Sequence, residues 1–146
     1  MLSSLKSIVR WFIEKPLGIV LVAGVASYFA SLNLDKASAS YIGATIGQIS
    51  GILLAFVLTA VVIMIISTRK SSETSQERHD AVRSVICSHV KTALLYLYAV
   101  IAALVVVFVS EEGSYLGTAL VTGLFAAGGV DMLRAGMEAG RLSRVE

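Results

Sequence analysis

The sequence predicts an all-α membrane protein with four transmembrane helices, an N-terminal amphipathic interfacial helix and a cytosolic extension of the third span. Three observations lead to this fold class. Of the 146 residues, 56% are hydrophobic and 15% are charged, and the mean hydropathy is +0.82, values outside the range of soluble domains. Four apolar stretches occupy more than half of the chain, which leaves too few residues for a separate soluble domain. Finally, if each apolar stretch crosses a membrane, nearly all of the basic residues lie in segments on the same side of it.

The chain opens with "MLSSLKSIVRWFIEK", residues 1–15, in which apolar residues recur at helical spacing among polar ones. This pattern predicts an amphipathic helix lying in the membrane interface, with Trp11 and Phe12 at the level of the lipid headgroups. Pro16 fits the first turn of the following helix, because an N–H at that position has no partner within the helix anyway.

Residues 16–146 are predicted to form one bundle, whose spans cover residues 17–32, 41–66, 92–109 and 115–130. The first span is short for a bilayer that needs about 20 apolar residues per helix. The second is long, which implies that it tilts or protrudes. The sequence "NLDKASAS" is expected to form the loop between them.

The segment 67–91 is the only long polar stretch, and it is predicted to connect the second and third spans in the cytosol. Thr74 and Glu77 have the spacing of a capping box, which marks a helix N-terminus. Apolar residues then recur at helical spacing without Gly or Pro, so we expect one continuous helix over 75–109. A glycine-containing cytosolic tail, 131–146, follows the fourth span.

The orientation follows from the positions of the basic residues. Of the 12 Lys and Arg residues, 11 lie before the first span, between the second and third, or after the fourth, and only Lys36 lies on the other side. Because cytoplasmic segments carry the excess of Lys and Arg, both termini are predicted to be cytoplasmic.

The second span has two faces of unusual composition. Glycines recur at every fourth position at Gly43, Gly47 and Gly51, and the fourth span has a looser set with Gly123 and Gly128. Because small residues let membrane helices approach closely, these five positions are candidates for helix packing. The second face is the candidate pore lining, and it comprises Thr45, Gln48, Ile52, Ala55, Thr59 and Val62.

These two faces allow two interpretations. In the first, the glycines and Gln48 serve ordinary bundle packing, with the amide bonded to a neighbouring helix. In the second, identical copies pack along the glycine face and turn Gln48 toward a shared aqueous axis, because an amide in hydrocarbon needs a partner or water.

The predicted connector carries all six basic candidates for ligand binding. They are Arg69, Lys70, Arg78, His79, Arg83 and Lys91. In an oligomer each copy would repeat this patch, so an anionic cytosolic ligand such as a nucleotide or an oligonucleotide is one hypothesis. Anionic membrane lipids, or the positive-inside rule alone, are the alternatives.

No motif for catalysis, phosphate binding or metal binding appears, so we expect no enzymatic activity, no cofactor and no metal. The leading functional hypothesis is a homo-oligomeric channel or pore. The alternatives are a structural or accessory subunit of a larger membrane complex and a small transporter. Small multidrug transporters carry an acid deep in the first span, whereas Glu14 here precedes Pro16.

In its size, span number and basic segment "TRKSSETSQERHDAVRSVICSHVK", the chain resembles the small multi-span effectors of bacterial antiphage systems, among them the Hailong-type effector. That resemblance implies a ligand-gated tetrameric channel in the bacterial inner membrane, whose basic vestibule binds oligodeoxyadenylate. It also implies that opening depolarises the host membrane. It transfers no functional residue to this sequence.

Overall fold

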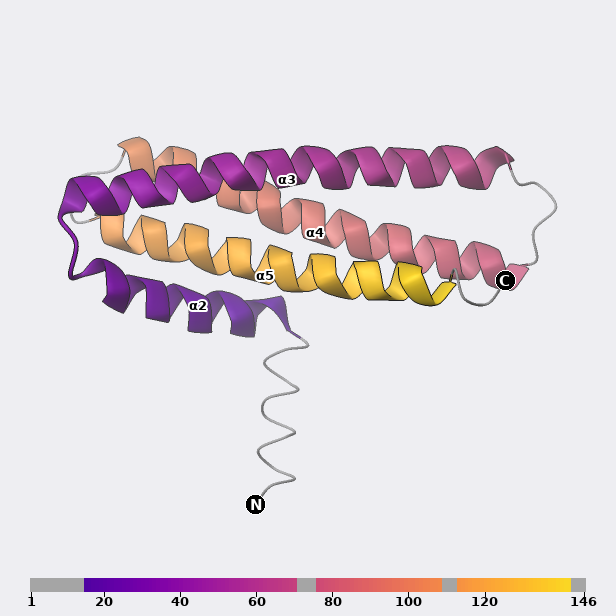
Figure 1. Cartoon of the computed structure of the whole chain (residues 1–146), viewed down its shortest axis with the longest axis horizontal. Helices are drawn as coiled ribbons and strands as arrows, with labels where there is room; N and C mark the ends of the chain where they lie inside the picture. Colours follow the sequence, from indigo (N-terminus) through magenta and orange to yellow (C-terminus); the bar gives the residue numbers. More distant parts are fainter. Residues whose placement is uncertain (1–14, 71–75, 109–112, 143–146) are drawn as a thin grey trace, which may run out of the picture.

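The computed structural model describes residues 15–70, 76–108 and 113–142, and these fold into four helices without any strand (Figure 1). The helices are α2 (Pro16–Ser31), α3 (Lys36–Lys70), α4 (Gln76–Phe108) and α5 (Gly113–Leu142). The predicted all-α class is therefore confirmed. The predicted amphipathic helix and Thr74 of the capping box fall on residues 1–14 and 71–75, outside the described part of the chain.

Three of the helices, α3, α4 and α5, are long and apolar enough to cross a membrane. The fourth apolar helix, α2, has 16 residues, which at 1.5 Å per residue gives about 24 Å. A bilayer core is about 30 Å thick, so α2 is short for a span. The helix nevertheless begins with Pro16 in its first turn, as the sequence predicts.

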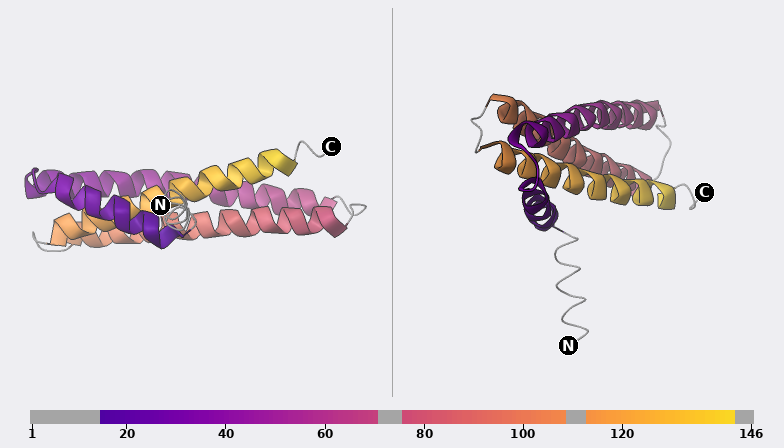
Figure 2. Two further views of the ribbon diagram at one scale, coloured as in Figure 1. Left: turned by 90° about the horizontal axis from the view of Figure 1, so that it is seen from below. Right: turned by 60° about the vertical axis from the view of Figure 1, so that its left-hand side comes forward.

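The long helices lie side by side, and α2 covers only part of this bundle (Figures 1 and 2). Each of α3, α4 and α5 packs against the other two, whereas α2 packs against α5. One core cluster joins Val57 of α3 to Ala93 and Tyr96 of α4. A second joins α4 to α5 through Val106 and Val121. The side of α3 that faces away from α4 and α5 therefore has no described helix over it.

Helix α3 begins at Lys36, five residues before Tyr41, where the second span is predicted to start. The loop between α2 and α3 is therefore shorter than predicted. Asp35 is the reason, because it precedes the first turn and accepts a hydrogen bond from the Ser38 backbone N–H at 3.3 Å. Hydrogen bonds from the Ser38 hydroxyl and then from its backbone N–H hold the pKa of the Asp35 carboxyl below its usual value. The chain reverses between α2 and α3 within residues 32–35.

Helix α5 continues to Leu142, twelve residues beyond Val130, where the predicted fourth span ends. Its C-terminal half is anchored by Ala135, which is fully buried. Arg134 and Asp131 also form an ion pair one turn apart, with 3.7 Å between nitrogen and oxygen. The glycines of the predicted tail lie within the helix. A glycine often ends a helix by adopting a positive φ, and no glycine among the described residues does so.

The predicted continuous third helix is present as α4, which runs without a break from the connector into the apolar segment. Val85, at the connector end, is as buried as Val106 near the other end. Burial along the whole length explains why the helix does not stop where the sequence becomes polar.

Candidate functional site

The candidate pore-lining face of α3 lies on the outside of the described helix bundle. Gln48, Ile52, Ala55, Thr59 and Val62 are exposed, and only Thr45 is half-buried. The opposite side of the helix is buried against α4 and α5, with Ser50 and Val57 almost completely covered. The structure thus brings the predicted residues together as one uncovered strip along the helix.

The polar groups of this strip differ in their hydrogen bonds. The Thr45 hydroxyl donates to the Tyr41 carbonyl, and the Thr59 hydroxyl donates to the Ala55 carbonyl, both at 2.8 Å. Each threonine is therefore satisfied by its own helix and can face lipid at little cost. Gln48 has no hydrogen-bond partner among the described residues, which makes its amide the one side chain of the strip that needs an outside partner.

The glycine face of α3 makes its contacts within the chain. A Cβ on Gly43 would come within 2.7 Å of the Thr118 hydroxyl of α5, and a Cβ on Gly47 would collide with the Ala103 methyl of α4. Gly51 lies against Val100. The expectation that copies of the chain meet along this face is therefore wrong, because helices of the same chain already fill the space.

The α5 glycines also serve contacts within the chain. A Cβ on Gly123 would come within 2.5 Å of the Val20 carbonyl oxygen of α2, and the ring of Tyr96 covers Gly128. Sequence reasoning missed Gly24, whose added Cβ would lie 3.2 Å from the Ala119 carbonyl oxygen. Its signal was weak, since Gly18 and Gly24 are six residues apart and so do not repeat on one face of the helix.

The end of α3 and the start of α4 lie at the same end of the bundle (Figure 1). Of the six basic candidates, Arg83 is exposed in the first third of α4, and Lys91 is exposed near the middle of that helix. The other four, whose side chains fall outside the described part of the structure, are Arg69, Lys70, Arg78 and His79. The sequence placed all six candidates in one connector, whereas the structure assigns Arg69 and Lys70 to the end of α3 and the other four to α4.

One charged cluster was not anticipated from the sequence. Asp131 of α5 pairs with Arg134 and is close enough to Lys91 of α4 for an electrostatic interaction. Lys91 thus has an acidic neighbour within its own chain, which weakens the attraction of Lys91 for an external anion. The sequence carried no signal for this, because the two residues are 40 positions apart.

Two hydroxyls tie α5 to the turn between α2 and α3. The Thr118 hydroxyl donates to the Ala39 carbonyl at 2.8 Å, and the Tyr115 hydroxyl donates to the Leu34 carbonyl at 3.0 Å. Thr118 is fully buried. These bonds fix the start of α3 and hence the position of the Gln48 strip.

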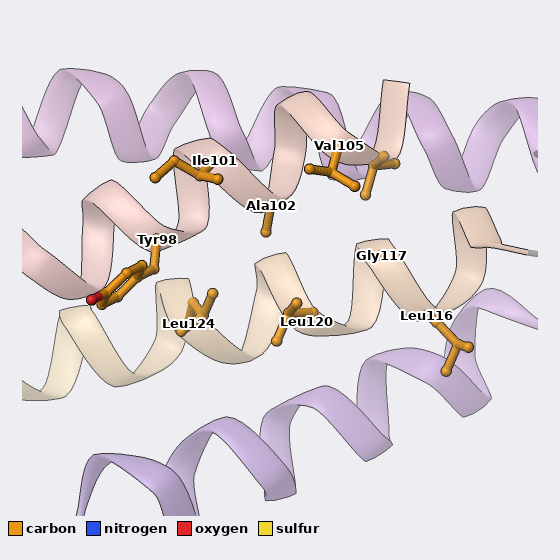
Figure 3. A pocket seen from close by; sticks show the side chains of 9 residues that line it. Tyr98, Ile101, Ala102, Val105, Leu116, Gly117, Leu120 and Leu124 are labelled. Atoms are coloured by element: carbon orange, nitrogen blue, oxygen red, sulfur yellow. The ribbon is translucent and has the colours of Figure 1, made fainter. Parts of the chain in front are cut away.

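Two hollows on the surface of the described residues are apolar. A groove of about 560 Å³ runs between α4 and α5 (Figure 3). It is lined by Tyr98, Ile101, Ala102, Val105, Val106, Leu116, Gly117, Leu120 and Leu124. A second groove, of about 740 Å³, is lined by residues that include Tyr96, Met132 and Met137. Neither presents an ionisable carboxyl, imidazole or amine, so neither offers a site for acid-base chemistry.

Within residues 15–70, 76–108 and 113–142, no group of three His, Cys, Asp or Glu side chains can hold a metal ion. His89 is engaged with its own helix, with Nδ1 2.9 Å from the Val85 carbonyl oxygen. Comparisons of the chain with family models, with curated proteins and with solved structures find no match. The physical character of the α3 strip is therefore the basis for assigning a function.

Proposed function

We propose that this protein is a homo-oligomeric membrane channel whose axis is lined by the exposed strip of α3. The observation that carries the proposal is the Gln48 amide, which is exposed and lacks a described partner on an apolar helix. An unpaired amide is costly in hydrocarbon. Copies arranged with α3 at the centre give each amide water or another amide as its partner.

The packing of the subunit supports a central position for α3. In the most apolar 18-residue window of each long helix, 17% of the residues are buried in α3 and 33% in α4 and in α5. Gly43 and Gly47 hold α3 against α5 and α4, so the covered side is occupied and the Gln48 side remains for neighbours. A helix with one fixed side and one free polar side suits a pore-lining position.

We further propose that the channel lies in a bacterial inner membrane with both termini in the cytoplasm, where residues 1–15 form an interfacial helix. The connector end of α4 then lies in the cytosol and offers Arg83 to an anionic ligand such as a nucleotide or oligonucleotide. Opening in response to such a ligand would depolarise the membrane and serve as antiviral defence. The protein acts without catalysis in this scheme.

An accessory subunit of a larger complex is the alternative, in which a partner helix covers the same strip and bonds Gln48. A small transporter is a further alternative, but it needs an ionisable group inside the membrane. The side chains described on the α3 strip are amide, hydroxyl and aliphatic. Measurements on the purified protein separate these functions.

The test is ion flux through reconstituted protein carrying Gln48→Leu. We expect the wild-type protein to form oligomers that conduct, and Gln48→Leu to lower the unitary conductance several-fold without changing the subunit number, because a dry side chain replaces an amide that faces water. Ser50→Ala is the matched control, since Ser50 is fully buried two residues away and donates its hydroxyl to the Ile46 carbonyl.

Undiminished current from Gln48→Leu would remove this residue from the conduction path. A wild-type protein that is monomeric in nanodiscs and carries no current would refute the channel and leave the accessory subunit as the better description.

A further inference from the structure

The last third of α3 presents a strip of exposed aliphatic side chains. Val62, Ile63, Ile65 and Ile66 are 53%, 59%, 38% and 51% exposed. The described helices leave them uncovered, because α2 packs against α5 on another side of the bundle (Figure 2). Whether lipid or protein covers these side chains depends on their depth in the membrane. That depth is judged relative to the charged residues of α4 and α5.

The core contacts give that depth. Val57 packs against Ala93 and Tyr96 of the antiparallel helix α4, and Lys91 lies two residues beyond Ala93 in the direction in which α3 continues. The ion pair of Asp131 and Arg134 is at this level too, since Asp131 interacts with Lys91. From Val57 to Ile66 is nine residues, so α3 extends roughly 14 Å past the contact.

Charged side chains mark the edge of the hydrocarbon. We place that edge on α4 and α5 at Lys91, Asp131 and Arg134, because beyond these residues α4 continues with His89 and Arg83 while α5 continues with Glu138. On this placement, the aliphatic strip of α3 lies beyond the edge, and the end of α3 protrudes from the membrane. Lipid chains would then not cover the strip, and exposed aliphatic groups in water are unfavourable.

We propose that a second copy of the chain covers this strip, and that Val62 and Ile66 of the copies meet at the axis as a hydrophobic constriction that closes the pore. This inference rests on the proposed channel function. Residues 48, 52, 55, 59, 62 and 66 follow one another at spacings of four and three, so Val62 and Ile66 continue the face of Gln48.

The sequence of α3 favours such a contact between copies. No charged residue occurs between Lys36 and Arg69, so nothing in this segment opposes the approach of identical helices. A ring of aliphatic side chains narrow enough to exclude water stops ions without a plug. The connector end of α4 lies at the same end of the bundle as the strip, on the opposite side of α3, so an anion bound there can act on the strip by moving the end of α3.

The first test is disulfide cross-linking between copies in membranes. In a Cys87→Ser background, Ile66→Cys and Val62→Cys should form cross-linked dimers under mild oxidation at least tenfold faster than Met137→Cys. Met137 is the control because it is 62% exposed on α5, six residues beyond Asp131 and therefore past the same charged level. Equal rates at the three positions, or no cross-linking at position 66, would overturn the inference.

The second test is the leak of the unstimulated protein. Ile66→Ser and Val62→Ser should raise basal ion flux at least tenfold, because hydroxyl groups wet the constriction, whereas Met137→Ser should not. Cross-linking at position 66 combined with an unchanged leak in conducting protein would overturn the gate and leave the contact between copies. If no variant conducts, including the wild type, the proposed channel itself fails, even where the α3 contact is found.

Discussion

Individual glycines in this bundle have different roles, and the difference is visible in what a methyl group at each would meet. At Gly47 the added Cβ would collide with the Ala103 methyl, whereas at Gly136 it would meet nothing within 4 Å. Both glycines lie inside helices and therefore carry the same loss of helix propensity, up to about 1 kcal/mol relative to alanine. Only Gly47 is compensated by close packing.

We accordingly predict opposite effects for one substitution at the two sites. Gly47→Ala should lower the free energy of unfolding by about 1–3 kcal/mol, because α3 and α4 must move apart. Gly136→Ala should leave it unchanged or raise it by up to about 1 kcal/mol. Thermal unfolding in detergent, followed by far-ultraviolet circular dichroism, measures both. A Gly47→Ala protein as stable as the wild type would show that the two helices are not in such close contact.

Residue patterns predicted which positions are special better than they predicted what those positions contact. The spacing of Gly43, Gly47 and Gly51 indicated a packing face, and Gln48 was placed on a different face of the same helix. Whether a glycine face meets a helix of the same chain or of another copy depends on tertiary packing. A repeat of small residues is the same in both cases, so the sequence alone could not decide.

Among the elements, α5 organises the others, because it contacts each of the remaining three helices. Its first turns hold the turn between α2 and α3 through the hydroxyls of Thr118 and Tyr115. Periodicity predicted that these helices exist. The ends of the helices were predicted less well. The start of α3 depends on the cap at Asp35, which is a local motif of four residues. The length of α5 depends on the burial of Ala135, which results from contacts between helices.

Thr118→Val tests the importance of this contact. The change keeps the shape of the side chain but removes the hydroxyl that donates to the Ala39 carbonyl, so we expect the free energy of unfolding to fall by about 1 kcal/mol. Thr59→Val is the matched control, because that exposed hydroxyl bonds only to its own helix and should be nearly neutral. Equal melting temperatures for the two variants would mean that the buried bond contributes nothing.

At the scale of the whole molecule, the fold class could be predicted because composition and the alternation of apolar and polar segments are global properties of the chain. The arrangement of the helices could not be predicted. It depends on the partial cover that α2 gives to the bundle and on the interaction between Lys91 and Asp131, which are distant in sequence. The exposed side of α3 is a consequence of that arrangement, and so is its proposed role at a shared axis.

The number of membrane crossings is the remaining global prediction, and α2 decides it. The helix is about 24 Å long, and it crosses the bilayer only if Lys15 at its exposed start extends its amine to the interface. Since 11 of the 12 basic residues agree with four crossings, we predict that reporters fused to the two termini lie on the same, cytoplasmic side. Cysteine labelling with a membrane-impermeant maleimide supplies the reference. Native Cys87, which is exposed, should react only from the cytoplasmic side. Asn33→Cys in a Cys87→Ser background should react only from the outside. Termini on opposite sides would mean three crossings, with α2 lying against α5 without traversing the membrane.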